Sequence, residues 1–256
     1  MTQLRFSANL GFLWADLPLV DAIFAAKAAG FAAVECHWPY DTPAKQVRAA
    51  LQDSGLRMLG INTSRGSDLD FGLCACPDRT EEARKSIEQA VAYADAIEAD
   101  AIHIMAGRAQ GPKAEAAFLD NLRFAAGLTS RTLLIEPLNP VDVPGYFLAS
   151  TDQAVDILSK VNAQHLKLMF DCYHVGRTEG DVIGRLRQLA PLIGHVQIAS
   201  VPDRLSPDQG ELDYDAVFDT LTDLHWSRPI GAEYRPNGPT DASLAWLQRI
   251  QATSPR

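Results

Sequence analysis

Four oxygen-bearing side chains stand at the ends of apolar segments in the second half of the chain. They are Glu136, Asp171, Gln197 and Glu233, and the residues before each of them have the composition of a β-strand. An apolar strand seldom ends in an inward carboxylate unless something compensates the cost of burying the charge. A divalent cation would compensate that cost. The sequence therefore predicts one metal site shared by these four side chains.

Three carboxylates and one amide oxygen form an all-oxygen ligand set. Such a set suits one Mg²⁺ or Mn²⁺ ion and gives little reason to select Zn²⁺ or Cu²⁺. Taken singly, Glu136 and Glu233 could equally form salt bridges at the rim of the fold, and Gln197 could simply bond to nearby backbone. The equivalent placement of all four residues is what favours the metal site.

Two glutamates on either side of a metal can divide a proton transfer between them. One removes a proton next to a carbonyl group and the other protonates the neighbouring carbon, while the cation stabilises the enediolate oxygens. This chemistry is that of an aldose-ketose type isomerase or of an epimerase. Glu136 and Glu233 are the candidates for the two proton-transferring groups.

Strand-like and helix-like segments alternate along the whole chain. We expect strands at residues 5–10, 32–37, 57–63, 101–107, 132–139, 166–173, 194–200 and 229–235. We expect helices at 18–29, 43–54, 78–97, 113–129, 151–161, 178–189 and 214–224, and a last helix after Pro239. Eight such repeats predict a single (β/α)₈ TIM-barrel domain over residues 1–256, with a doubly wound open sheet as the alternative. No Gly-x-Gly-x-x-Gly motif follows the first strand, so a dinucleotide site has little support.

The predicted barrel gives the four ligands a common position. Active sites of such barrels lie at the carboxyl ends of the strands. The four residues would end strands five to eight, and adjacent strands lie about 4.8 Å apart, so their side chains can converge. The longest irregular segment, residues 63–77, follows strand three at this same face. Long loops in this position often cover the substrate.

Composition and charge exclude several classes of protein. The 256 residues are 47% hydrophobic and carry a net charge of −9, with no block of Lys and Arg. We therefore expect a small-molecule substrate, a hydroxy-keto acid or a sugar, rather than nucleic acid. We see neither a membrane-spanning run nor a secretion signal, and we expect a cytoplasmic protein with reduced cysteines. The sequence is compatible with a homo-oligomer and sets no subunit number.

Five stretches together carry a resemblance to a known family, and the match runs nearly end to end. They are Arg5 to Leu10, Pro39-Tyr40-Asp41, Ile135 to Asn139 with Pro144-Gly145-Tyr146, Asp171-Cys172-Tyr173-His174 with Glu179-Gly180, and Ile193 to Ala199. The chain resembles the hydroxypyruvate isomerase family of the xylose-isomerase-like barrels, which includes 2-oxo-tetronate isomerases. The resemblance implies interconversion of hydroxypyruvate and tartronate semialdehyde, or of a related 2-oxo-tetronate.

The resemblance also implies a division of roles. Glu136 and Glu233 fall on the proton-transferring glutamates of the family, which also bind the metal, and Asp171 and Gln197 fall on the remaining ligands. Related ketose 3-epimerases generally have histidine in place of Gln197, which favours the isomerase branch. The loop after strand seven departs from the family, because Arg204 is followed by a turn that lacks the first glycine of the usual Pro-Gly-x-Gly-Glu. Whether Arg204 reaches the substrate is therefore open.

Four further residues are candidates for substrate binding. His174, three residues after Asp171, could bond a substrate oxygen or support Glu136. Asn62, Arg108 and Arg204 lie at predicted strand ends, where arginine could bind a carboxylate through two parallel hydrogen bonds. For each arginine, a solvated loop charge is the simpler interpretation.

Other functions remain as alternatives. A ketose 3-epimerase acting on a small sugar would share the chemistry. A metal-dependent phosphodiesterase or nuclease on this barrel would bind several zinc ions, for which six histidines and an acidic surface are a poor basis. A barrel that only binds a metabolite would not need both Glu136 and Glu233.

Overall fold

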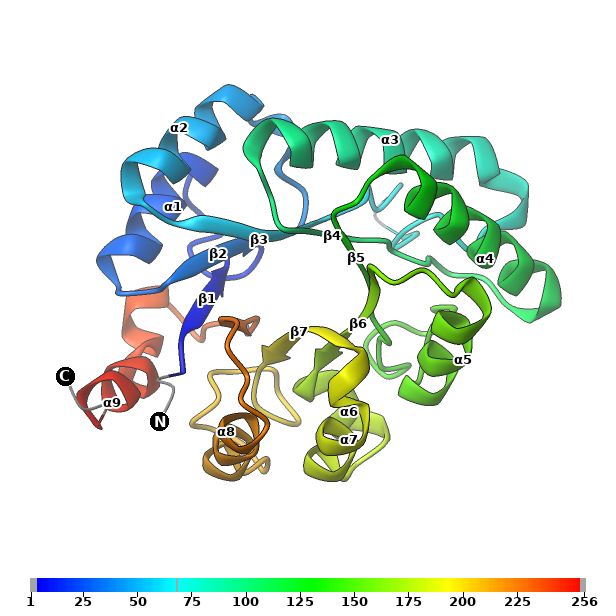
Figure 1. Ribbon diagram of the computed structural model, residues 1–256. Helices are drawn as coiled ribbons and strands as arrows, with labels where there is room; N and C mark the ends of the chain where they lie inside the picture. Colours follow the sequence, from blue (N-terminus) through cyan, green and yellow to red (C-terminus); the bar gives the residue numbers. More distant parts are fainter. Residues whose placement is uncertain (1–3, 68, 254–256) are drawn as a thin grey trace.

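Eight parallel strands close into a barrel in the computed structural model, which describes residues 4–67 and 69–253 (Figure 1). Neighbours in sequence are neighbours in the sheet, and β1 pairs with β8 to close it. The strands are β1 (Phe6–Asn9), β2 (Ala33–Cys36), β3 (Arg57–Asn62), β4 (Ala101–His103), β5 (Thr132–Ile135), β6 (Leu166–Asp171), β7 (Ile193–Ile198) and β8 (Ile230–Ala232). The predicted barrel is confirmed and the open-sheet alternative is wrong, because β1 and β8 would not pair with each other in an open sheet.

Helices form an outer layer around the barrel (Figure 1). The α-helices are α1 (Leu19–Ala28), α2 (Ala44–Ser54), α3 (Thr80–Ile97), α4 (Gly111–Leu128), α5 (Thr151–Val161), α6 (Cys172–Thr178), α7 (Val182–Leu189), α8 (Tyr214–Asp223) and α9 (Ala245–Thr253). Short 3₁₀ turns are η1 (Pro39–Asp41), η2 (Pro77–Arg79), η3 (Ala190–Leu192) and η4 (Thr240–Ser243).

Local sequence explains where these helices start and stop. The Ser150 side chain accepts a hydrogen bond from the backbone N–H of Gln153 and caps α5, and Asp213 caps α8 in the same way. Gly55 follows α2 with a φ of 69°, a left-handed conformation that glycine adopts without strain. The predicted starts of α5 and α8 are confirmed.

One predicted helix has the wrong start. The sequence predicts a single helix over residues 178–189, whereas α6 starts directly at the end of β6 and α7 covers only Val182–Leu189 of the predicted range. The cause is Asp171, whose side chain accepts a hydrogen bond from the backbone N–H of Tyr173 at 2.9 Å and thereby caps α6. Gly180 and Asp181, both with positive φ, then turn the chain into α7. The helix cap and the predicted metal ligand are thus the same residue.

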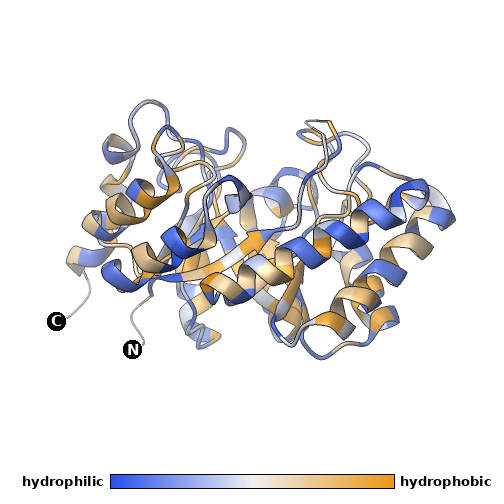
Figure 2. Ribbon diagram, turned by 90° about the horizontal axis from the view of Figure 1, so that it is seen from above, coloured by the Kyte–Doolittle hydropathy of each residue, from blue (hydrophilic) through white to orange (hydrophobic). Residues whose placement is uncertain are grey.

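The outer helices bury one face against the barrel. On α3 the buried residues include Ala83, Ile87, Ala90 and Ala94, which share one face at helical spacing. Hydrophilic and hydrophobic residues accordingly alternate along the outer helices in Figure 2. Within residues 4–67 and 69–253, no helix combines the length and the apolar character needed to cross a membrane.

Candidate active site

A pocket of about 330 Å³ lies where the strands end, and five of the predicted functional residues line it, among them Glu136, Glu233 and Arg204. Glu136 follows β5, Glu233 follows β8, and Arg204 lies in the loop after β7. Asp171 and Gln197 are paired in register on β6 and β7 next to this pocket. The structure therefore brings the four predicted metal ligands to one end of the barrel.

Glu233 is buried and strongly held. Its Oε1 accepts a hydrogen bond from Asn9 at 2.8 Å and lies 2.9 Å from Nε2 of His37, and its Oε2 is bonded to the guanidinium of Arg204. Burial alone would raise the pKa of Glu233, but the charge of Arg204 and the hydrogen bond from His37 hold it well below its usual range. Glu233 is thus a carboxylate kept ionised in a buried place.

Glu136 has the opposite environment. It is buried, and its Oε1 has no hydrogen-bond partner among the described residues. Burial, together with the negative charges of Glu233 and Asp171, raises the pKa of Glu136 well above its usual range. Burial also raises the pKa of Asp171 to about 7, against the opposing charge of Arg204, whose guanidinium lies 3.5 Å from Asp171 Oδ2. A bound divalent cation would lower the pKa of each of these carboxyls.

His174 lies over two of the carboxylates. Its Nδ1 accepts a hydrogen bond from the backbone N–H of Asn139 at 3.0 Å. Its Nε2 lies 3.8 Å from Glu136 Oε1 and 3.6 Å from Asp171 Oδ2. Burial and the charge of Arg204 lower the pKa of His174 to about 3, so the ring is neutral and its proton sits on Nε2, which faces the carboxylates.

Gln197 presents a bare oxygen. Its Nε2 donates to Oε2 of Glu35 at 2.9 Å, whereas its Oε1 is buried and has no partner among the described residues. Two buried oxygens without partners, on Gln197 and Glu136, beside two further carboxylates, fit a hard divalent cation. Among the described residues, Glu136, Asp171 and His174 form a group of potential ligands, with one ligand atom of each within 4.8 Å of the others. His174 is therefore closer to the predicted metal position than the sequence indicated.

The remaining predicted residues divide into two groups. Asn62 lines the pocket, as do Arg204 and His174. Arg108 does not line it: this residue is exposed, and its guanidinium stacks over Phe71 at 5.2 Å. Part of the segment after β3 does reach the pocket, where Arg65 and Phe71 form its wall.

The prediction missed two contacts of the site. His37 bonds to Glu233, and Glu35 bonds to Gln197. The sequence does contain a sign of Glu35, because this residue is a charged side chain within the apolar strand Ala-Val-Glu-Cys, like the four predicted ligands at the ends of their apolar strands. His37 had none, since a single histidine after a strand does not reveal its contact.

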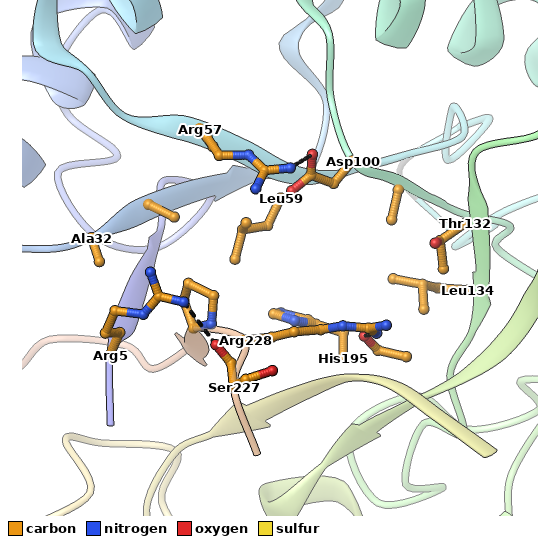
Figure 3. A pocket seen from close by; sticks show the side chains of 14 residues that line it. Arg5, Ala32, Arg57, Leu59, Asp100, Thr132, Leu134, His195, Ser227 and Arg228 are labelled. Carbon is orange, nitrogen blue, oxygen red and sulfur yellow. Dashed lines mark hydrogen bonds and ion pairs between the residues drawn. The ribbon is translucent and has the colours of Figure 1, made fainter. Parts of the chain in front are cut away.

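A larger pocket, of about 500 Å³, opens at the other end of the barrel (Figure 3). Its rim carries Arg5, Arg57 and Arg228, and Arg57 is paired with Asp100 at 2.5 Å. His195 lies on its wall. This is the amino-terminal face, where barrels place residues for stability rather than for catalysis. Lacking a group of carboxylates, it is not the candidate active site.

Comparison with known proteins identifies the family. The model of the xylose isomerase-like TIM barrel matches residues 23–250. The chain belongs to this family. It is 42% identical to the 2-oxo-tetronate isomerase of Cupriavidus necator over 95% of its length and 97% of the relative, and 33% identical to the hydroxypyruvate isomerase of Escherichia coli over 96% and 98%. Since it matches such isomerases over almost their full length, the chain is an isomerase of the family.

Solved structures agree on the fold. A Brucella melitensis protein described as an AP endonuclease of family 2 superposes with a TM-score of 0.92 at 33% identity, covering 97% of this chain and 99% of that one. A D-allulose 3-epimerase from Methylomonas superposes with a TM-score of 0.77 at 18% identity, over 98% of this chain and 91% of that one, a likeness of fold alone.

Proposed function

We propose that this isomerase is metal-dependent and interconverts hydroxypyruvate and tartronate semialdehyde, or a related 2-oxo-tetronate. The observation that carries the proposal is the pair Glu136 and Glu233 in one pocket. Their surroundings shift the two pKa values in opposite directions. Two titratable groups whose pKa values are shifted in opposite directions are typical of an acid and base pair.

The chain's own residues would perform the proton transfer. Arg204, Asn9 and His37 fix the carboxylate of Glu233 and keep it ionised, so it can accept the proton next to the substrate carbonyl. Glu136, which follows β5, would return a proton to the neighbouring carbon. Each such group contributes about 10²- to 10⁴-fold in rate.

The metal would be held by Glu136, Asp171, Gln197 and Glu233, as Mg²⁺ or Mn²⁺. When bound, the cation supplies positive charge beside the two substrate oxygens that gain negative charge during the reaction. His174, with its Nε2 proton directed at this place, would donate a hydrogen bond to a substrate oxygen. Asn62 would line the substrate's other side.

The walls of the pocket favour an acid over a neutral sugar. Although the chain has a net charge of −9, the pocket is lined by Arg65, Arg204 and Arg235. The guanidinium groups of Arg204 and Arg235 lie 4.9 and 5.3 Å from the ring centre of Phe12, which also lines the pocket. Arginine is suited to carboxylate recognition. The substrate carboxylate would therefore bind on this side, which favours a keto acid over the ketose of a 3-epimerase.

Proton NMR of hydroxypyruvate with the purified protein and Mn²⁺ or Mg²⁺ tests the proposal. We expect conversion to tartronate semialdehyde, or conversion of a 2-oxo-tetronate, with loss of activity in EDTA. D-fructose and an abasic-site DNA duplex serve as controls for the epimerase and phosphodiesterase alternatives, and neither should react. Turnover of the sugar alone, or cleavage of the duplex, would contradict the proposal.

A further inference from the structure

Glu35 forms a buried cluster beneath the candidate metal position. This carboxylate lies on β2, a strand that supplies none of the proposed metal ligands, and it is 4% exposed. Its Oε1 accepts from the hydroxyl of Ser7 on β1 at 2.9 Å. Its Oε2 lies 2.9 Å both from Nε2 of Gln197 and from Nε2 of His195 on β7. Two strands, β1 and β7, thus supply the partners of one carboxylate on β2.

We propose that Glu35 is a positioning residue that turns the amide of Gln197 so that its oxygen faces the metal site. This inference rests on the proposed metal-dependent function. A carboxylate can only accept hydrogen bonds, so only the NH₂ group of the Gln197 amide can face Glu35. The reverse orientation would bring the amide oxygen against the Glu35 carboxylate, and would point two N–H donors at the site.

The reverse orientation would also harm metal binding directly. Two N–H donors beside Asp171, the register partner of Gln197, would hydrogen-bond to this carboxylate and compete with a cation for its oxygens. In the observed orientation Gln197 Oε1 is buried and finds no partner in the described part of the chain, as expected of an oxygen that binds a ligand. Residues that orient metal ligands in this way typically change metal affinity by about 10- to 100-fold.

The backbone leaves room for this cluster at one position. Gly231 on β8 pairs in register with both Ser7 and Gln197. A Cβ at this glycine would overlap Oε1 of Glu35 and crowd Nε2 of His195 and Cγ of Gln197. The absence of a side chain on β8 is what allows the carboxylate to reach Gln197. A close approach of this kind is a recognised reason for glycine inside a strand.

His195 separates the cluster from the opposite end of the barrel. Its ring lines the large amino-terminal pocket, seen in Figure 3, while its Nε2 contacts Glu35. His195 is itself buried. The carboxylate is therefore screened from that pocket, which preserves the strength of its hydrogen bond to Gln197.

A double-mutant cycle measured by Mn²⁺ binding tests the proposal without relying on turnover. In Glu35→Gln the new amide can donate to Gln197 Oε1, so the Gln197 amide is free to turn. We expect isothermal titration calorimetry to give a Kd for Mn²⁺ about 10- to 100-fold weaker than in the wild type. In a Gln197→Glu background the ligand has two equivalent oxygens and no orientation to lose. There, Glu35→Gln also removes a like-charge contact, and we expect unchanged or tighter binding.

A purely structural role for Glu35 predicts a different result, namely equal weakening in both backgrounds. That outcome, or an unchanged Kd in Glu35→Gln, would overturn the inference. If Glu35→Gln does not fold, Glu35→Asp retains the charge but withdraws it by one methylene group, and the same loss and the same dependence on Gln197 are expected. Wild-type protein that binds no Mn²⁺ would refute the proposed function and this inference together, whereas equal affinities would refute the inference alone.

Discussion

The substitution Glu233→Gln tests the assignment of the catalytic base. The side chain keeps its size, but an amide cannot take a proton from carbon at neutral pH. We expect solvent-deuterium exchange at the substrate carbon to fall by about 10²- to 10⁴-fold, which is about 2.7–5.4 kcal/mol of transition-state stabilisation at 1.36 kcal/mol per tenfold.

The structure also predicts the cost to the fold. Asn9, His37 and Arg204 can each donate a hydrogen bond to Glu233, and the NH₂ group of a glutamine would face one of these donors. One mismatched buried group costs about 1–3 kcal/mol, less than the 5–15 kcal/mol by which proteins of this kind are usually stable. The variant should therefore fold.

Deuterium incorporation from D₂O, followed by proton NMR, is the appropriate assay, with circular dichroism as the check of folding. Glu81→Gln on the outer helix α3 is a matched control, because the Glu81 side chain is 85% exposed and pairs with Lys85 on its own helix. It should exchange at the wild-type rate. Full exchange in folded Glu233→Gln would remove Glu233 from the proton-transfer role.

Two further predictions concern charge in the site. The pKa values of Asp171 (about 7) and Glu136 are raised, so a metal that binds below pH 7 must displace protons from these carboxyls. Calorimetry should therefore show that the affinity for Mn²⁺ falls about tenfold for each unit by which the pH is lowered, for each proton displaced. A raised pKa in the folded state also means that the metal-free protein loses stability as pH rises through 7. Mn²⁺ should therefore raise the melting temperature more at pH 8 than at pH 6. An affinity for Mn²⁺ that does not change with pH would contradict this reasoning. Arg204→Met leaves buried carboxylates without a compensating charge, and denaturant unfolding at pH 8 without metal should show a free energy of unfolding lower by about 3–5 kcal/mol. Mn²⁺ should recover part of this loss. Arg228→Met, at the opposite end of the barrel, should show no such recovery.

The barrel could be predicted because its signal is repeated eight times. Each strand is a short apolar run between helical patterns, and all eight expected strands are present. The one wrong helix shows where this signal ends: the sequence does not reveal that Asp171 caps a helix starting at the very end of β6. Sequence periodicity records which face is buried, but a capping contact depends on the exact path of the backbone.

The site was predictable to the extent that burial cost is visible in sequence. Four strand-end polar residues were found because a buried carboxylate or amide within an apolar run is unexpected. The sequence leaves open whether Arg204 reaches the substrate, because the turn after it is unusual, and it does not predict the contact of Arg204 with Glu233. In the structure Arg204 adopts a φ of 56°, and its backbone oxygen accepts from the N–H of Arg235 at 2.7 Å. Such long-range pairing leaves no trace in local spacing.

The closing seam of the barrel has a consequence for folding. The hydrogen bond from Asn9 to Glu233 joins residues 224 positions apart, and it crosses from β1 to β8. Contacts between the two ends of a chain form slowly, because much conformational entropy is lost before they are made. A refolding molecule can therefore acquire secondary structure, and even most of its sheet, while it is still unable to hold its base in place. Competence for catalysis would appear in the last step of folding. The last elements to meet would be β1 and α9, which are adjacent in Figure 1 and joined by the contact of Phe6 with Trp246.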